Sequence, residues 1–262
     1  MKIALVTGAS SGIGREFVRQ LAAREEIDGF WLVARSRERL EETARMTEKP
    51  CEILTADLGT PEGIAAVEEK LVAEKPTVSV LVNAAGFGVF GAFDQLEEKT
   101  VAGMIDLNVK ALVLLTHATI PYMPRGGRII EMGSGSCFTP LPYFNIYSSS
   151  KVFVLHYTKS LNYELRRYGV RATCFCPGWV ETPFLPKSKA NAGVPTPKSM
   201  KPLLAVDRVV RGCLAASQKG KTMYVTGVYT KFQHLLFKLL PDRILTRLWL
   251  GMLRTPDGKK PE

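Results

Sequence analysis

Short apolar runs alternate along the chain with longer stretches in which apolar residues recur every three or four positions. The runs that we interpret as buried strands cover residues 2–7, 29–34, 51–56, 78–83, 127–133, 170–176 and 222–226. The stretches that we interpret as helices cover residues 13–25, 37–46, 61–74, 97–123, 145–168 and 205–218. This alternation predicts an α/β fold, in which about seven strands form a doubly wound parallel sheet with helices on both faces.

The chain continues for about 35 residues after the last predicted strand. Two apolar stripes, separated by Pro241, predict two short helices within residues 229–253. The first stripe comprises Phe232, Leu235, Leu236, Leu239 and Leu240, and the second Ile244, Leu245, Leu248, Trp249, Met252 and Leu253. We therefore expect a domain at residues 1–227 and, at 228–262, a basic amphipathic helical extension packed on it near the substrate entrance or a subunit contact.

A glycine-rich turn, Thr7–Gly14, joins the first predicted strand to the first helix. In such a turn Gly8 permits a sharp bend, Gly12 lets the backbone approach a phosphate, and Gly14 allows the helix to pack closely on the strand. The helix N-terminus would offer unpaired N–H groups to a pyrophosphate. The turn predicts a Rossmann-type dinucleotide-binding domain, and the alternative is an ordinary glycine-rich connection.

Tyr147 and Lys151 stand four positions apart in a predicted helix, so their side chains share one face. A tyrosine has a reference pKa of about 10, and a nearby ammonium group lowers that pKa because it favours the phenolate. The pair is therefore suited to exchange a proton with an alcohol or a carbonyl near neutral pH. Ser134, thirteen residues before Tyr147, is a nearby hydroxyl, and Ser136 is a second choice.

With these residues, the chain resembles the short-chain dehydrogenase/reductase family over roughly residues 1–227. The resemblance rests on several segments that occur in the family's order. They are Thr7–Gly14, Asp57-Leu58, Asn83–Gly86, Asn108, Ser134, Tyr147–Lys151 and Pro177–Thr182. The family's fold and chemistry agree with the expected sheet and with the proton-transfer pair.

The resemblance implies a role for each of four catalytic residues. Tyr147 would be the general acid and base, and Lys151 would lower its pKa and bind the nicotinamide ribose. Ser134 would orient the substrate oxygen, while Asn108 would kink its helix and anchor a water leading to the lysine. The implied cofactor-binding residues are Gly8, Ser10, Ser11, Gly12, Ile13, Gly14, Arg35, Ser36, Asp57, Leu58, Asn83, Ala84, Gly86, Tyr147, Lys151, Pro177, Gly178, Val180 and Thr182.

The end of the second predicted strand indicates which cofactor is used. Relatives that bind NAD usually carry an acidic residue there, whereas this chain has Ala34 followed by Arg35. A carboxylate would repel the 2′-phosphate of NADP, while a guanidinium can bind it with charge-assisted hydrogen bonds. We therefore expect NADP(H), with Arg35 as the main contact, Ser36 and Arg37 assisting, and Arg15 a weaker choice. Alternatively, these arginines are a solvated start to a surface helix.

Apolar residues gather where the predicted loops meet the carboxyl edge of the sheet. They are Phe87, Val89, Phe90, Phe93, Cys137, Phe138, Leu141, Tyr143, Phe144, Trp179, Phe184 and Leu185. They predict an apolar pocket, and the proline-rich segment 183–202 predicts a lid over it. A lipophilic ketone or secondary alcohol is expected, with a hydroxysteroid or bile acid favoured. The alternatives are a 3-oxoacyl reductase and a non-catalytic NADP(H)-binding scaffold or sensor.

Composition and charge limit the partners. Five scattered cysteines and three isolated histidines favour a reducing cytoplasm and predict neither disulfides nor a metal site. No signal peptide is expected, because its removal would take the glycine turn with it. Residues 198–262 hold 13 Lys and Arg but only 4 Asp and Glu, or +9 of the net charge of +10. No nucleic-acid motif accompanies this charge, so we expect a homodimer or homotetramer and consider a peripheral membrane contact through the extension.

Overall fold

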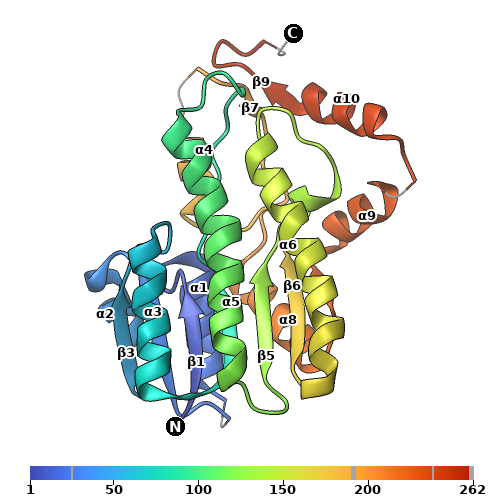
Figure 1. Cartoon of the computed structure of the whole chain (residues 1–262). Coiled ribbons are helices and arrows are strands. Elements are labelled where there is room, and N and C mark those ends of the chain that lie inside the picture. Colours follow the sequence, from blue (N-terminus) through green and yellow to red (C-terminus); the bar gives the residue numbers. More distant parts are fainter. Residues whose placement is uncertain (25, 190–192, 238, 260–262) are drawn as a thin grey trace.

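Seven parallel strands form the central sheet of the computed structural model, which describes residues 1–24, 26–189, 193–237 and 239–259 (Figure 1). The strands are β1 (Lys2–Thr7), β2 (Gly29–Ala34), β3 (Cys51–Thr55), β4 (Thr77–Asn83), β5 (Arg128–Met132), β6 (Arg171–Cys176) and β8 (Met223–Val225). Their order in the sheet is β3-β2-β1-β4-β5-β6-β8. The predicted doubly wound parallel sheet is confirmed, each strand lying within two residues of its predicted bounds.

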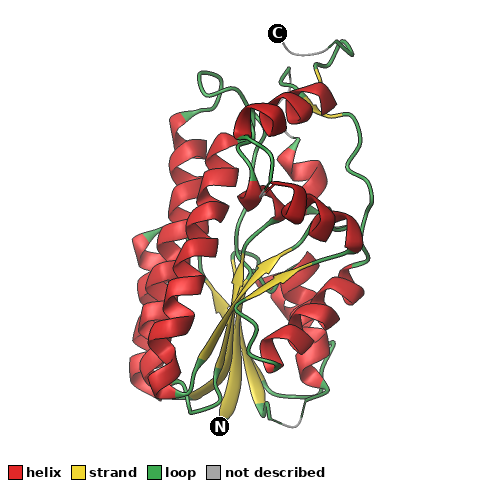
Figure 2. Cartoon of the chain, turned by 90° about the vertical axis from the view of Figure 1, so that its right-hand side faces the viewer, coloured by secondary structure: helices red, strands yellow, loops and turns green. Residues whose placement is uncertain are grey.

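Helices cover both faces of the sheet, as the view along its edge shows (Figure 2). The helices on one face are α1 (Gly12–Ala22), α2 (Arg37–Ala44) and α8 (Val206–Gln218), and those on the other are α3 (Pro61–Glu74), α4 (Glu98–Ile105), α5 (Leu112–Thr119) and α6 (Asn145–Glu164). The pleat of β1 divides its side chains between two cores: Ala4 and Val6 pack with Phe17 of α1, while Ile3 and Leu5 pack with Ile64 of α3. Both faces of the sheet are therefore buried, which explains why its strands are continuous apolar runs.

The long helix predicted at 97–123 is interrupted at its centre. A π-helical segment, Asp106–Ala111, separates α4 from α5, and a 3₁₀ turn, Ile120–Tyr122, ends it. By length and composition Glu98–Tyr122 is long and apolar enough to cross a membrane, and it is the one such helix among the described residues. Here it packs against α3, α6 and β4, as expected for a helix of an α/β domain. Two further 3₁₀ segments, Gly135–Phe138 and Leu165–Tyr168, flank α6.

The C-terminal extension forms the two predicted helices, α9 (Val228–Phe237) and α10 (Asp242–Met252). After α10, β9 (Leu253–Arg254) pairs antiparallel with β7 (Thr196–Pro197). The segment predicted as a lid, 183–202, thus holds β7 and a short helix, α7 (Phe184–Ser188). The extension and this segment are hydrogen-bonded to each other above the carboxyl edge of the sheet (Figure 1). Residues 190–192, 238 and 260–262, which fall in these predicted segments, lie outside the described residues.

A buried polar network joins the middle of the sheet to α5. The Oε1 atom of Glu131 on β5 accepts a hydrogen bond from Thr116 at 2.8 Å, and its Oε2 atom accepts one from Nδ2 of Asn83 at 3.1 Å. Glu131 is completely buried. Burial raises the pKa of this carboxyl to about 7, although the hydrogen bonds from Thr116 and Asn83 act in the opposite direction. The folded protein therefore holds a proton here at pH values where an exposed glutamate has lost it.

The Glu131 carboxyl makes stability depend on pH. Because its pKa is raised from 4.5 to about 7, the unfolded chain releases this proton first, so the free energy of unfolding falls as pH rises from about 5 through 7. We predict that Glu131→Gln, which keeps the shape without the charge, matches the wild type at pH 5. At pH 8 it should be more stable by roughly 3 kcal/mol.

Urea unfolding at pH 5 and pH 8 measures this difference. The control is Glu69→Gln, which removes an exposed carboxylate of α3 and should keep the wild-type pH dependence. An unchanged slope in Glu131→Gln would show that another group causes it.

Candidate active site

The glycine turn is built by backbone contacts that leave no room for side chains. A Cβ atom at Gly14 would lie 2.2 Å from the carbonyl oxygen of Gly8, and one at Gly8 would lie 2.8 Å from the backbone of Ala84. Gly8 and Gly12 have φ values of 65° and 53°, in the left-handed region that favours glycine. α1 begins at Gly12, and Ser11 makes no side-chain hydrogen bond to its first turn. The helix N-terminus therefore faces the cavity with backbone N–H groups available to an anion.

A cavity of about 860 Å³ runs along the carboxyl ends of the strands. It brings together segments that are far apart in sequence, as parallel strands with right-handed crossovers require. The predicted site residues that line it are Gly8, Ser10, Ser11, Gly12, Ile13, Gly14, Arg35, Ser36, Asp57, Leu58, Ala84, Gly86, Ser134, Tyr147, Lys151, Pro177, Gly178, Val180 and Thr182. Two of the predicted site residues, Asn83 and Asn108, do not line the cavity.

Asn83 was predicted to bind the cofactor, but its side chain does not reach the cavity. Its Nδ2 atom donates to Thr116 at 2.9 Å and to Glu131 at 3.1 Å. Alternation along β4 directs the Asn83 side chain into the layer between the sheet and α5, and only the backbone after it turns into the cavity. The sequence did not reveal this role because its partners stand 33 and 48 positions away.

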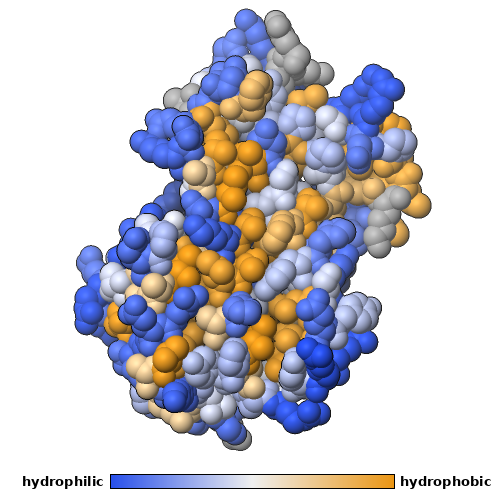
Figure 3. Space-filling view, viewed as in Figure 1, coloured by the Kyte–Doolittle hydropathy of each residue, from blue (hydrophilic) through white to orange (hydrophobic). Residues whose placement is uncertain are grey.

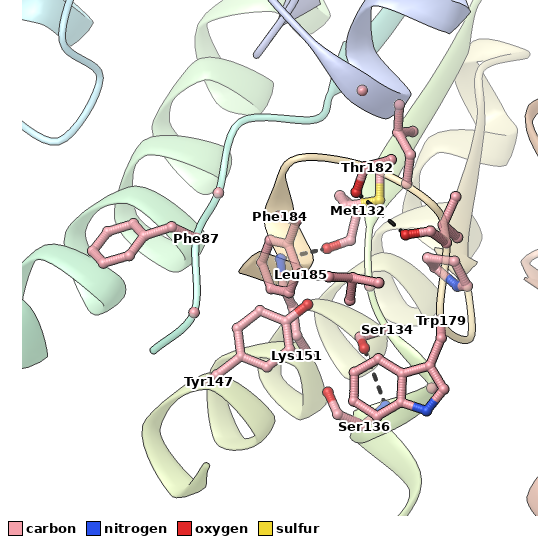
Figure 4. A pocket seen from close by; sticks show the side chains of 18 of the residues that line it. Phe87, Met132, Ser134, Ser136, Tyr147, Lys151, Trp179, Thr182, Phe184 and Leu185 are labelled. Carbon is pink, nitrogen blue, oxygen red and sulfur yellow. Dashed lines mark hydrogen bonds between the residues drawn. The ribbon is translucent and has the colours of Figure 1, made fainter. Parts of the chain in front are cut away.

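Tyr147, Ser134 and Lys151 meet at the centre of the cavity (Figure 4). Tyr147 and Lys151 come from α6, and Ser134 follows β5. The hydroxyl of Ser134 accepts from the backbone N–H of Ser136 at 3.1 Å and lies on the Tyr147 side of the cavity, where it acts to lower the pKa of the phenol. The Nζ atom of Lys151 lies 5.5 Å from the centre of the Tyr147 ring and donates to the carbonyl of Met132 at 2.8 Å. The predicted pairing of a phenol with an ammonium group is therefore present in space.

Burial dominates the protonation of this pair. Tyr147 is 8% exposed and Lys151 is 2% exposed. Removal from water raises the pKa of Tyr147 to about 12 despite the opposing effect of Ser134, and lowers the pKa of Lys151 to about 8. The sequence argument, which predicted a lowered tyrosine pKa, is wrong in direction because it did not count this desolvation. With a pKa raised in this way, the phenol stays protonated at neutral pH.

Asn108 lies in the π-helical segment and connects three parts of the site. Its Oδ1 atom accepts from the N–H of Phe87 at 3.0 Å, and its Nδ2 atom donates to the carbonyl of Phe87 at 2.8 Å and to Ser150 of α6 at 3.2 Å. A Cβ atom at Gly86 would stand 2.8 Å from Asn108 Oδ1 and 3.5 Å from Lys151 Nζ. Asn108 thus fixes the strand-end loop beside Lys151 without entering the cavity, and π-bulges are frequent at such sites.

Basic side chains lie at the end of the cavity beyond β2. Arg35 is exposed, and its guanidinium lies 3.9 Å from a carboxylate oxygen of Asp57. Ser36 lines the cavity and caps α2 by accepting from the N–H of Arg39 at 3.4 Å. Arg39 also lines the cavity. Sequence reasoning missed it, although its place in the first turn after the Ser36 cap was the available signal.

The two other predicted arginines do not line the cavity. Arg15 donates to the carbonyl of Ser10 and to Glu42, each at 2.8 Å. Arg37 pairs with Glu41 on the surface of α2 at 3.1 Å. The structure therefore leaves Arg35, with Arg39 in support, as the cations that face this end of the cavity.

The other end of the cavity is apolar. Its side chains include Leu141, Phe144, Trp179, Phe184, Leu185, Tyr229, Leu236, Leu245 and Trp249. The Tyr147 ring packs against Phe144 and Phe184, with ring centres 4.5 and 5.4 Å away. Trp249 of α10 donates from its indole N–H to the carbonyl of Pro142 at 2.8 Å. The extension therefore forms part of the cavity wall, as one reading of its apolar stripes predicted.

Several aromatic residues predicted for the pocket lie elsewhere. Phe93 is 82% exposed, and Phe90 is buried behind the cavity with its ring stacked on Phe144 at 4.0 Å. Cys137, Phe138 and Tyr143 do not line the cavity either. Phe87 does line it, with its ring turned towards α4 (Figure 4). Loop residues alternate between the wall and the layer behind it, and apolar character alone does not distinguish these positions.

Comparison with known proteins places this geometry in a family. Residues 2–193 match the family model described as short chain dehydrogenase. The chain belongs to the short-chain dehydrogenase family. An uncharacterized oxidoreductase of Staphylococcus epidermidis is 32% identical over 185 residues, covering 70% of this chain and 80% of that protein.

Two further relatives extend beyond the matched region. Estradiol 17-beta-dehydrogenase 11 of Pongo abelii is 30% identical over 259 residues, covering 94% of this chain and 82% of that protein. A short-chain dehydrogenase from Sphingobium yanoikuyae, solved in complex with NADPH, superposes with a TM-score of 0.77 at 28% identity. The superposition covers 91% of this chain and 94% of that one. The chain is thus an oxidoreductase of this family.

Gly88 provides a test of how the Tyr147 ring is positioned. A Cβ atom there would lie 2.4 Å from Cδ2 of the ring. We predict that Gly88→Ala displaces the ring and lowers kcat at least tenfold while cofactor affinity stays within a few-fold. Steady-state kinetics and cofactor titration measure the two effects.

Gly251→Ala is the matched control, because nothing lies within 4 Å of its Cβ position in α10. Full activity in Gly88→Ala would contradict the positional role of this contact.

Proposed function

We propose that the protein is an NADP(H)-dependent oxidoreductase that interconverts a lipophilic ketone and a secondary alcohol. One observation carries this proposal: Tyr147 and Ser134 lie together at the boundary between two halves of the cavity. One half is lined by the glycine turn and by arginines, and the other by aromatic and aliphatic side chains. The first half suits a dinucleotide and the second an apolar substrate. The reacting carbon would then lie beside the phenol.

The residues present fit NADP(H). The glycine cradle has no room for Cβ atoms and presents the α1 N-terminus, which suits a pyrophosphate. Arg35 and Arg39 supply positive charge where the 2′-phosphate of the adenine ribose would lie. Position 34 is alanine, so no carboxylate at the end of β2 would repel that phosphate. Asp57 and Leu58 line the same end for the adenine. The NADPH complex of the relative from Sphingobium yanoikuyae supports this assignment.

The protein's own residues provide the proton chemistry. Bound NADPH supplies the hydride for reduction. Tyr147 donates its phenolic proton to the carbonyl oxygen as alkoxide character develops there, and accepts it back in the oxidation direction. Ser134 donates to the same oxygen and orients it. Lys151 stabilises the phenolate that Tyr147 becomes, and Asn108 holds the Gly86–Phe87 backbone against both.

A bulky lipophilic substrate is favoured by the cavity wall. Trp179, Phe184, Leu245 and Trp249 converge on the Tyr147 side from three separate segments of the chain. Relatedness to estradiol 17-beta-dehydrogenase 11 over most of the chain supports a steroid-sized ketone or alcohol. Among the described residues, the arginines of the lining, Arg35 and Arg39, both lie at the other end of the cavity. No pair of arginines therefore stands beside the phenol to bind a small di-acid.

We also propose that the active form in the cytoplasm is a homodimer formed through α5 and α6. Figure 3 shows apolar residues gathered over these helices. The exposed apolar side chains of α5 and α6 include Leu114, Val152 and Phe153, which are 38%, 38% and 44% exposed. A patch of this kind on a soluble enzyme marks an association surface. The exposed side of the long helix is then explained by a subunit contact.

A panel of ketones, followed by NADPH absorbance, tests the proposed function. Steroid and bile-acid ketones should be reduced with kcat/KM at least tenfold above that for a short aliphatic ketone. Preference for 3-oxoacyl thioesters would favour the reductase alternative. Tight NADPH binding without turnover of any ketone or alcohol would indicate a scaffold or sensor.

We predict that Tyr147→Phe lowers kcat by at least a thousandfold, because only the proton donor is removed while the ring remains between Phe144 and Phe184. Cofactor affinity should change by less than a few-fold. Tyr157→Phe is the control, since that hydroxyl also belongs to a tyrosine of α6, half-buried, but does not line the cavity. Substantial turnover in Tyr147→Phe would exclude its acid–base role.

Cofactor preference is expected to follow Arg35. The double variant Ala34→Asp with Arg35→Ser should lose ten- to a hundredfold in NADPH affinity, equivalent to roughly 1.5–3 kcal/mol for a charged hydrogen bond, and should gain in preference for NADH. Arg37→Ser is the control, because Arg37 pairs with Glu41 outside the cavity. Preference of the unaltered protein for NADH in kcat/KM would refute the assignment.

A further inference from the structure

The outer surface of α10 carries two exposed ridges side by side. Ile244, Leu248 and Met252 stand four positions apart along the helix and are 43%, 54% and 45% exposed. Arg243 and Arg247 form the neighbouring ridge and are also exposed. The opposite side of α10 is buried, with Leu245 at 2% and Trp249 at 6% exposure. The helix therefore presents an apolar and basic surface to the outside after its inner surface is packed.

α9 continues the same surface. Phe232 and Leu235 are 61% and 59% exposed, and Leu239 in the connection to α10 is 74% exposed. Lys231 stands exposed beside them. Figure 3 shows apolar residues gathered at the right-hand edge of the molecule, where Figure 1 places α9. Exposed apolar side chains at this density are unusual in a solvated helix pair.

The cavity opens at this surface. Phe232, Leu248 and Met252 line the cavity and are also about half exposed, so they form its rim. Two exposed lysines, Lys187 and Lys201, line the cavity as well. A substrate that leaves the apolar half of the cavity therefore passes between apolar and basic side chains of the rim.

The charge on the surface is mostly positive. The described residues of 228–254 contain four basic side chains, Lys231, Arg243, Arg247 and Arg254, and one acidic side chain, Asp242. Arg254 donates to the carbonyl of Gly251 at 2.9 Å, and no salt bridge of the described structure involves any of these five. Unpaired basic residues beside apolar ridges complement a layer that has anionic groups above hydrocarbon.

We propose that α9 and α10 dock the enzyme on a bilayer that contains anionic lipid, so that the lipophilic substrate enters the cavity directly from the hydrocarbon. The apolar ridges reach the acyl boundary while Lys231, Arg243 and Arg247 contact headgroup phosphates and carboxylates. The protein lies on the membrane and does not span it. This inference rests on the proposed function only for the identity of the molecule that enters the cavity, a lipophilic ketone or alcohol.

Sedimentation with vesicles tests the charge component without any turnover. Wild type should bind vesicles of phosphatidylcholine with phosphatidylglycerol, bind phosphatidylcholine alone much more weakly, and be released by salt. Arg243→Gln with Arg247→Gln should weaken binding roughly thirtyfold, at about tenfold per 1.4 kcal/mol and about 1 kcal/mol for each basic residue. Lys219→Gln with Lys221→Gln is the control of equal charge, since both residues are exposed near the other end of the sheet.

The apolar component has its own pair of variants. Leu239→Gln with Ile244→Gln, which do not line the cavity, should abolish vesicle binding and leave turnover of a water-soluble ketone unchanged. Val72→Gln with Met46→Gln removes two exposed apolar residues elsewhere, 62% and 42% exposed, and should keep binding. Circular dichroism confirms that each variant is folded.

Two outcomes would overturn the proposal. In the first, the wild type does not bind anionic vesicles, and Leu239→Gln with Ile244→Gln lowers the molar mass measured by light scattering. A second copy of the chain would then cover the surface. If all variants bind vesicles alike, the surface has no special role. Failure of the proposed enzyme function is a separate result, because it would show as absent turnover while vesicle binding of the wild type persisted.

Discussion

The buried ammonium group of Lys151 is the constraint on which the site depends. A cation removed from water must be compensated, and here the carbonyl of Met132 accepts its hydrogen bond at 2.8 Å where β5 ends. That contact fixes α6 against the sheet edge and thereby sets the position of Tyr147 one helical turn earlier. Because the ammonium has lost its hydration, its pKa falls to about 8. The Lys151 ammonium lies close enough to Tyr147 to stabilise a phenolate when the phenol loses its proton.

The same desolvation determines the protonation state of Tyr147. Burial raises the pKa of Tyr147 to about 12, so the phenol is protonated and able to donate. In the proposed mechanism, oxidation of an alcohol would require Tyr147 to lose that proton first, and the positive charge of an oxidised nicotinamide ring would favour this. The neighbouring Glu131 carboxyl, buried with Asn83 and Thr116, adds a second proton-dependent group behind the catalytic layer. Fold stability and site electrostatics are therefore linked through β5.

The sequence predicted the fold and most of the cavity because both depend on local signals. Apolar runs fix buried strands, and the glycines at positions 8 and 14 mark places where backbones touch. It did not predict that Asn83 faces away from the cavity, since this follows from contacts with residues of α5 and β5. It also gave the wrong direction for the pKa of Tyr147, because desolvation depends on everything packed around the phenol. Arg39 was missed because a surface helix contains many arginines, and only the fold shows which of them faces the cavity.

The C-terminal extension shows how one segment can serve two surfaces. Its inner residues, Leu245 and Trp249, complete the apolar wall, and its outer residues remain exposed after packing. Amphipathic periodicity predicted the helices but not this division, because both sides of α10 carry apolar residues. Burial in the structure is what separates the wall of the cavity from the surface that faces outward.

Deuterium transfer is the most direct test of the central claim that a hydride moves to a ketone held beside Tyr147. NADPH carrying deuterium at the transferable C4 position is incubated with the enzyme and the best ketone of the panel, and the alcohol is analysed by mass spectrometry. The account predicts one deuterium on the carbinol carbon of each product molecule, and at least a thousandfold slower formation of this labelled alcohol when Tyr147→Phe is used. Alcohol formed without the label, or NADPH consumed without alcohol, would contradict it.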